Sequence, residues 1–126
     1  MDRDYWLREF YAVIGTFSSK DRQRSDWVVG DGERQSYWGE DVTIILDDLG
    51  VEQYFDQLSD DFAFPRQVSE EIKKLRDLLL VFSEKDMSFE SLMADSRWDK
   101  VIDQSKEVKT VIEREFPTVI LPRPNG

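Results

Sequence analysis

Apolar side chains recur at the period of an α-helix in three long stretches of this sequence, and this pattern restricts the possible folds more than any other feature. The stretches cover about residues 3–18, 68–82 and 96–115. Each stripe needs an apolar surface to face, so the sequence predicts helices packed around a shared core. The stripes are Trp6, Phe10, Val13 and Phe17; Ile72, Leu75, Leu79 and Phe82; and Trp98, Val101, Ile102, Ser105, Val108 and Ile112.

A fourth stretch, residues 37–49, fits either a helix or a strand. Its β-branched centre, from Val42 to Ile45, favours a strand. A helix would instead place several of its apolar residues on one face, and Gly50 would then occupy the position just after the helix end. The length of the stretch favours the helix, and a short β element around residues 27–46 remains the alternative. The residues of that helical face are Trp38, Val42, Ile45, Leu46 and Leu49.

The remaining segments carry weaker patterns. Residues 18–36 look irregular and contain the turn signal Gly30-Asp31-Gly32. Residues 51–64 read as a short helix or an ordered loop, and residues 89–94 as one short helical piece. No repeat and no interdomain linker interrupts the chain, so we expect a single domain.

Together these patterns predict a mostly α fold, a single-domain bundle of about four to five helices over residues 1–116. Ser69 is the expected N-cap of one long helix, and Asp95 or Ser96 the N-cap of the last one. Three prolines, Pro117, Pro122 and Pro124, follow the last helix. They predict an extended proline-rich tail over residues 117–126.

Composition excludes several chemistries. The chain of 126 residues has no Cys and no His, which removes thiol catalysis, Cys-ligated zinc and the commonest general base. Mg²⁺ prefers oxygen ligands, and the carboxylate pairs Asp47-Asp48 and Asp60-Asp61 could contribute to such a site. Adjacent residues on a helix point in different directions, so neither pair is a chelate by itself. We therefore expect no enzyme activity, no cofactor and no metal site, and we keep a Mg²⁺-dependent hydrolase as a minor alternative.

The charge of the chain is concentrated in one segment. The formal net charge is −10, and residues 35–65 hold eight acids and no Lys or Arg, which accounts for −8 of it. Such a field repels nucleic acid and attracts a basic protein. The compact basic group Lys20, Arg22 and Arg24 is expected to pair internally with this acidic segment. The predicted binding residues are the acids Asp41, Asp47, Asp48, Glu52, Asp56, Asp60 and Asp61 and the aromatic anchors Tyr37, Trp38 and Tyr54.

Nothing in the sequence points to export or to a membrane. The first residues, 1–4, are charged and lack the hydrophobic region of a signal peptide. The longest apolar run, residues 78–82, is far shorter than the roughly 20 residues of a membrane-spanning helix. We therefore expect a cytoplasmic protein.

Three features together resemble a known class. These are Arg24-Ser25-Asp26-Trp27-Val28 after the first helix, Asp47-Asp48 ending an apolar segment, and Asp95-Ser96-Arg97-Trp98 opening the last helix. The sequence resembles immunity proteins of bacterial contact-dependent growth inhibition and related polymorphic toxin systems. The resemblance implies binding to the toxin domain of a cognate effector, often a basic nuclease, and it transfers no site residue. The alternative from another class is an acidic regulatory adaptor or DNA-mimic inhibitor.

Overall fold

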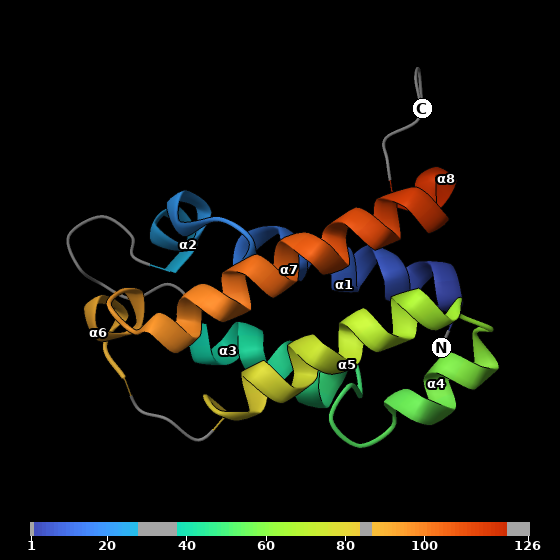
Figure 1. Cartoon of the computed structure of the whole chain (residues 1–126), viewed down its shortest axis with the longest axis horizontal. Helices are drawn as coiled ribbons and strands as arrows, with labels where there is room; N and C mark the ends of the chain where they lie inside the picture. Colours follow the sequence, from blue (N-terminus) through green and yellow to red (C-terminus); the bar gives the residue numbers. More distant parts are fainter. Residues whose placement is uncertain (1, 28–37, 84–86, 121–126) are drawn as a thin grey trace.

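The computed structural model describes residues 2–27, 38–83 and 87–120, and these ranges are almost entirely helical (Figure 1). They contain no strand, which confirms the mostly α single domain. The helical alternative is therefore correct for residues 38–48, while residues 28–37 of the possible β element lie outside the described ranges. In chain order the elements are α1 (Arg3–Phe17), α2 (Lys20–Trp27), α3 (Trp38–Thr43), the π-helical segment η1 (Ile44–Asp48), α4 (Phe55–Asp61), α5 (Arg66–Leu80), α6 (Phe89–Met93), α7 (Ser96–Glu115) and α8 (Pro117–Ile120).

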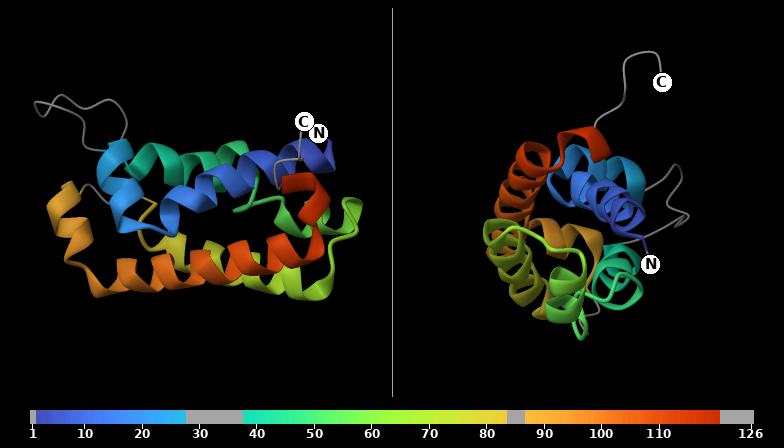
Figure 2. Two further views of the ribbon diagram at one scale, coloured as in Figure 1. Left: turned by 90° about the horizontal axis from the view of Figure 1, so that it is seen from above. Right: turned by 90° about the vertical axis from the view of Figure 1, so that its right-hand side faces the viewer.

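Four helical rods, meaning the three long helices and the continuous helix α3–η1, form the body of the molecule. Seen end-on in Figure 2, α1, α5, α7 and the continuous helix α3–η1 surround one core, with α7 and α3–η1 at opposite corners. Helix α7 packs along both α5 and α1. The described residues hold more helices than the expected four to five, because several connections between the rods are themselves short helices. None of the described helices is both long enough and apolar enough to cross a lipid bilayer.

The core has two aromatic clusters at opposite ends of α1. At one end Trp6 stacks on Phe10 with ring centroids 4.9 Å apart, and rings from the α4 region complete that cluster. At the other end Trp98 of α7 is fully buried among four rings from four different segments. Their centroids lie 5.2–6.3 Å from that of Trp98. The four rings are Phe17, Trp27, Trp38 and Phe82.

A buried glutamine joins α1, α2 and α7. The Gln23 amide nitrogen donates hydrogen bonds to the carbonyl oxygens of Thr16 and Phe17, at 3.1 and 2.9 Å. Its amide oxygen accepts a hydrogen bond of 3.0 Å from Trp98 Nε1. The carbonyl groups at the end of a helix lack partners within the helix, so Gln23 satisfies the end of α1 and the indole at once. The segment that forms α2 was expected to be irregular. Only Gln23 and Trp27 of this helix are buried, so its sequence has no apolar stripe that would predict a helix.

One helix start differs from expectation and another agrees. Helix α5 begins at Arg66 with Pro65 at the N-cap position, while the Ser69 hydroxyl hydrogen-bonds with that of Ser59 instead of capping. The cap at Asp95 is confirmed, because its side chain accepts a hydrogen bond from the backbone N–H of Arg97 at 2.8 Å.

The expected extended tail is wrong for Pro117–Ile120, which form α8 against α1 and α7. Proline suits the first position of a helix, where its missing N–H would have no partner in any case. The rest of the tail, residues 121–126, lies outside the described ranges.

Replacing Gln23 with Ala should destabilise the fold strongly. The change leaves the buried Trp98 indole N–H and the Phe17 carbonyl without the partners that the described chain gives them, while the Thr16 carbonyl keeps the backbone N–H of Ser19. Each unsatisfied group costs about 1–3 kcal/mol, so we expect the free energy of unfolding to fall by about 3 kcal/mol. Urea unfolding followed by tryptophan fluorescence measures it.

Ser105→Ala is the matched control for this substitution. The Ser105 side chain is also fully buried, but its hydroxyl is a polar atom for which the described part of the chain provides no hydrogen-bond partner. Its removal relieves a desolvation cost, so the free energy of unfolding should stay level or rise. A loss of stability at Ser105 equal to the loss at Gln23 would contradict the role given to the Gln23 hydrogen bonds.

Candidate functional site

An open hollow lies where η1 ends and α4 begins to cover the end of the bundle. Its volume is about 400 Å³. Leu49, Gly50 and Leu58 form its apolar floor above the buried Trp6 ring. Exposed side chains stand around this floor. They are Asp47, Asp48, Tyr54, Gln57 and Asp61.

The backbone at the end of η1 sets the shape of this hollow. Gly50 has φ +73°, in the left-handed region that glycine adopts easily, so its predicted place just after the helix end is confirmed. A Cβ on Gly50 would also meet Leu58 and Tyr54, at 3.4 and 3.6 Å. Trp6 Nε1 donates a hydrogen bond of 2.8 Å to the Leu49 carbonyl oxygen, which fixes the turn to α1. Short π-helical segments like η1 occur frequently at functional sites.

Two smaller hollows continue from the first along the same face. One is lined by Leu46, Asp47, Gln53 and Tyr54, and the other reaches Glu52 and Ser83. All three share Asp47, so they adjoin one another. The described residues that line them include no Lys or Arg. We call this surface the acidic groove, and define it by Asp47, Asp48, Glu52, Tyr54 and Asp61.

The carboxylates of the groove have no cationic partner among the residues that the structure describes. Within the described part of the chain, no ion pair and no side-chain hydrogen bond reaches the carboxylate of Asp47, Asp48, Glu52 or Asp61. The basic group at the start of α2 was expected to pair with the acidic segment, but it pairs elsewhere. Its partners are Asp99 for Lys20, Asp26 for Arg22 and Glu90 for Arg24.

Both carboxylate pairs occupy the last turn of a helix. Asp47 and Asp48 end the continuous helix α3–η1, and Asp60 and Asp61 end α4. Neither helix has a basic residue in its last turn. The carbonyl end of a helix carries partial negative charge, so an acid there is unfavourable by about 0.3–1 kcal/mol. These acids therefore oppose stability, and a bound cation would relieve them.

The structure separates the other predicted binding residues from the groove. Trp38 is 2% exposed and belongs to the core, so it cannot anchor a partner. Asp56 pairs with Lys73 of α5 at 2.6 Å, and the hydrogen bond and charge of Lys73 lower the pKa of Asp56. Asp60 is exposed on α4 but does not line the three hollows. Tyr37 lies outside the described residues, whereas Tyr54 is 60% exposed, as a surface anchor requires.

Asp41 is half-buried at the start of α3 and has a structural contact. Its carboxylate accepts a hydrogen bond of 2.8 Å from Trp27 Nε1, which ties α3 to α2. Burial raises the pKa of Asp41, the Trp27 hydrogen bond opposes this rise, and the charges of Asp26 and Glu40 add to it. Asp41 is therefore a core-edge residue and does not line the groove.

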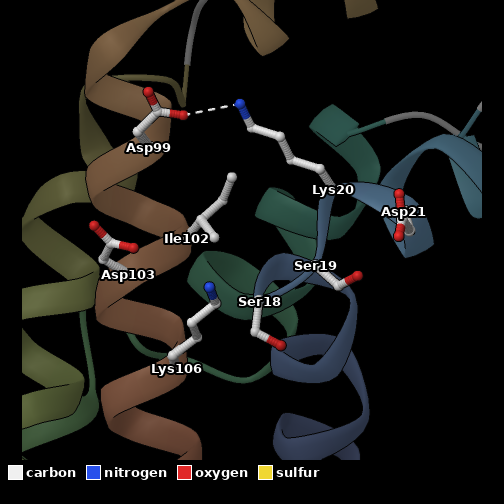
Figure 3. A pocket seen from close by; sticks show the side chains of 8 residues that line it. All are labelled: Ser18, Ser19, Lys20, Asp21, Asp99, Ile102, Asp103 and Lys106. Carbon is white, nitrogen blue, oxygen red and sulfur yellow. Dashed lines mark ion pairs between the residues drawn. The ribbon is translucent and has the colours of Figure 1, made fainter.

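A second, larger hollow was not anticipated from the sequence. It has a volume of about 530 Å³ and lies between the α1–α2 junction and α7 (Figure 3). Its charges are mixed, because two lysines and three aspartates line it and Lys20 pairs with Asp99 at 3.0 Å. The Ser18 and Ser19 hydroxyls are used within the chain, as a donor to the Gly15 carbonyl oxygen and an acceptor from the Arg22 backbone N–H. This hollow presents no single sign of charge to a ligand.

Asp41→Asn should change how stability depends on pH. The folded protein holds the Asp41 proton to a higher pH than the unfolded chain does, so this group's contribution falls as pH rises through the folded-state pKa. Asn keeps an acceptor for Trp27 and never ionises. The free energy of unfolding of the variant should therefore increase relative to that of the wild type as pH rises, and the difference should become constant above the folded-state pKa of Asp41. Urea unfolding at a series of pH values from about 3.5 to 7 measures this.

Asp56→Asn provides the opposite trend as a control. Its lowered pKa stabilises the folded protein above the ordinary pKa of an aspartate, and this contribution disappears on acidification. The deficit of the Asp56 variant should therefore shrink as pH falls. Parallel pH profiles for wild type and Asp41→Asn would contradict the effect assigned to burial.

Neutralising the pair at the end of η1 should stabilise the protein. Asp47→Asn with Asp48→Asn removes two charges from a negative helix end, and we expect a gain of about 0.3–1 kcal/mol for each at low salt. The matched pair Asp103→Asn with Glu107→Gln changes the net charge equally on α7, across the bundle and away from a helix end. Equal thermal shifts for the two double variants would show that net charge alone matters.

The described residues contain no group of three or more acidic side chains placed to hold a metal ion. The carboxylates of the groove thus surround a surface without forming a chelate. No protein-family model, no curated protein and no solved structure shows a significant match to this chain.

Proposed function

We propose that this protein is an immunity protein that binds and neutralises a bacterial toxin domain with a basic surface, using the acidic groove. One observation carries the proposal. Three carboxylates that have no cationic partner within the described part of the chain surround an apolar floor and an exposed tyrosine, and all three stand at helix ends where they oppose stability.

The chemistry of the groove favours a protein partner over a small metabolite. Protein interfaces commonly combine an aromatic anchor with a charged rim, and Tyr54 with its neighbouring acids has this composition. A uniformly acidic face also accelerates the encounter with a basic protein, by roughly 10 to 1,000-fold at low salt. Speed of capture matters to a cell that must neutralise a toxin before it acts.

A nuclease is the toxin class that best fits this surface. An enzyme that cleaves nucleic acid presents cations to bind phosphate groups, and an acidic protein can occupy those cations instead. Inhibition could then follow from covering the active site or a nearby surface, and both routes use the same charges.

Asp47→Asn with Asp48→Asn should weaken protection against the toxin. The test uses the C-terminal domain of a secreted effector encoded next to this gene, if genome sequencing finds one, in co-expression and in stopped-flow association. We expect wild type to restore growth, and the double variant to associate about 10-fold more slowly with a shallower salt dependence. The α7 control, Asp103→Asn with Glu107→Gln, should remain close to wild type.

Two outcomes would redirect the assignment. Unchanged association after charge removal at Asp47 and Asp48 would remove the groove as the binding surface. Groove-dependent binding of a basic protein without any protection from a toxin would favour the acidic adaptor or DNA-mimic inhibitor.

A further inference from the structure

The hollow between η1 and α4 has room for a large side chain. Its volume of about 400 Å³ is at the lower end of the range for small-ligand pockets, about 300–1,000 Å³. A partner helix or strand could lie across it and insert a side chain. We propose that the hollow receives one arginine side chain of the basic partner, an inference that rests on the proposed function.

The floor of the hollow suits the stem of such a side chain. Leu49 and Leu58 offer apolar surface, and the polar atom of the underlying Trp6 is already used, since its indole N–H donates to the Leu49 carbonyl oxygen. Long cationic side chains pack their methylene groups on apolar surface while the charged end stays near water. A floor of this kind contributes nothing to a bare cation such as Mg²⁺, so it separates a side chain from an ion.

The rim suits the charged end. Asp48 comes from η1 and Asp61 from α4, so the two carboxylates flank the hollow from different elements. A guanidinium group has five N–H donors in one plane and can bond to carboxylates on two sides. Neither carboxylate has a cationic partner within the described chain, so binding breaks no existing ion pair.

Tyr54 favours arginine over lysine. Its ring lines the hollow and remains 60% exposed, so one face is available to a ligand. A guanidinium group stacks on an aromatic ring and holds water weakly, whereas the ammonium group of lysine is compact and strongly hydrated. An aromatic ring beside paired carboxylates therefore selects a planar cation.

Three short peptides test this assignment directly. They share a neutral glycine and serine sequence and differ at one central residue, which is arginine, lysine or citrulline. Binding to the whole protein is followed by backbone amide shifts in NMR spectra. We expect the arginine peptide to shift amides of η1 and the start of α4, to bind about three-fold more tightly than the lysine peptide, and the citrulline peptide not to bind.

Variants at the rim and at the ring separate the two contributions. Asp48→Asn with Asp61→Asn should abolish binding of the arginine peptide. Tyr54→Leu should remove the preference for arginine, while Tyr54→Phe keeps it. The α7 pair, Asp103→Asn with Glu107→Gln, should bind like wild type. Equal affinity for arginine and lysine, or shifts centred on the mixed-charge hollow beside Lys20, would overturn the assignment.

This inference and the proposed function can fail separately. If the toxin domain binds through Asp47 and Asp48 but the arginine peptide does not bind at this hollow, the arginine site is wrong and the immunity role stands. If the arginine peptide binds here but no toxin is neutralised, the site stands and the immunity role is wrong.

Discussion

The fold depends on the burial of Trp98 and on satisfying its one polar atom. Four rings from separate segments close around this indole, and Gln23 accepts its hydrogen bond while also donating to the end of α1. Segments from five separate parts of the sequence meet at this point. The apolar energy comes from the rings, but the register between α1, α2 and α7 comes from the amide, because hydrogen bonds are directional and burial is not.

Helices α1, α5 and α7 were predictable from sequence because each carries a continuous apolar stripe, and every core position named for the α5 stretch is buried. Helix α2 was not, since it contributes only an amide and an indole to the interior. Burial of Trp38 was equally hidden: an aromatic beside acids can face either way, and the choice is made by Trp98, sixty residues along the chain. The density of acidic residues in the sequence identified the segment that contains the groove. Only the fold shows that Asp41 and Asp56 have structural contacts. The acids that line the groove are Asp47, Asp48, Glu52 and Asp61.

Two opposed requirements meet at the end of η1. A stable helix prefers cations in its last turn, whereas capture of a basic partner needs carboxylates at the surface. Here the carboxylates occupy both helix ends that border the groove, and the basic residues Lys20 and Arg24 of α2 pair with Asp99 and Glu90. The large aromatic core can tolerate this local cost. Stability gained in one part of the molecule thus permits an electrostatically unfavourable arrangement in another.

The hydrogen bond from Trp6 to the Leu49 carbonyl oxygen holds a fluorescent side chain next to the groove. All four indoles of this protein lie in the interior, and only Trp6 is directly beneath the groove. A charged group or an aromatic ring that binds above Trp6 alters the local electric field and therefore shifts the wavelength of its fluorescence emission. The other three indoles, grouped at the far end of α1, provide an internal reference. Occupancy of the acidic groove can therefore be followed by the intrinsic tryptophan fluorescence of the unlabelled protein.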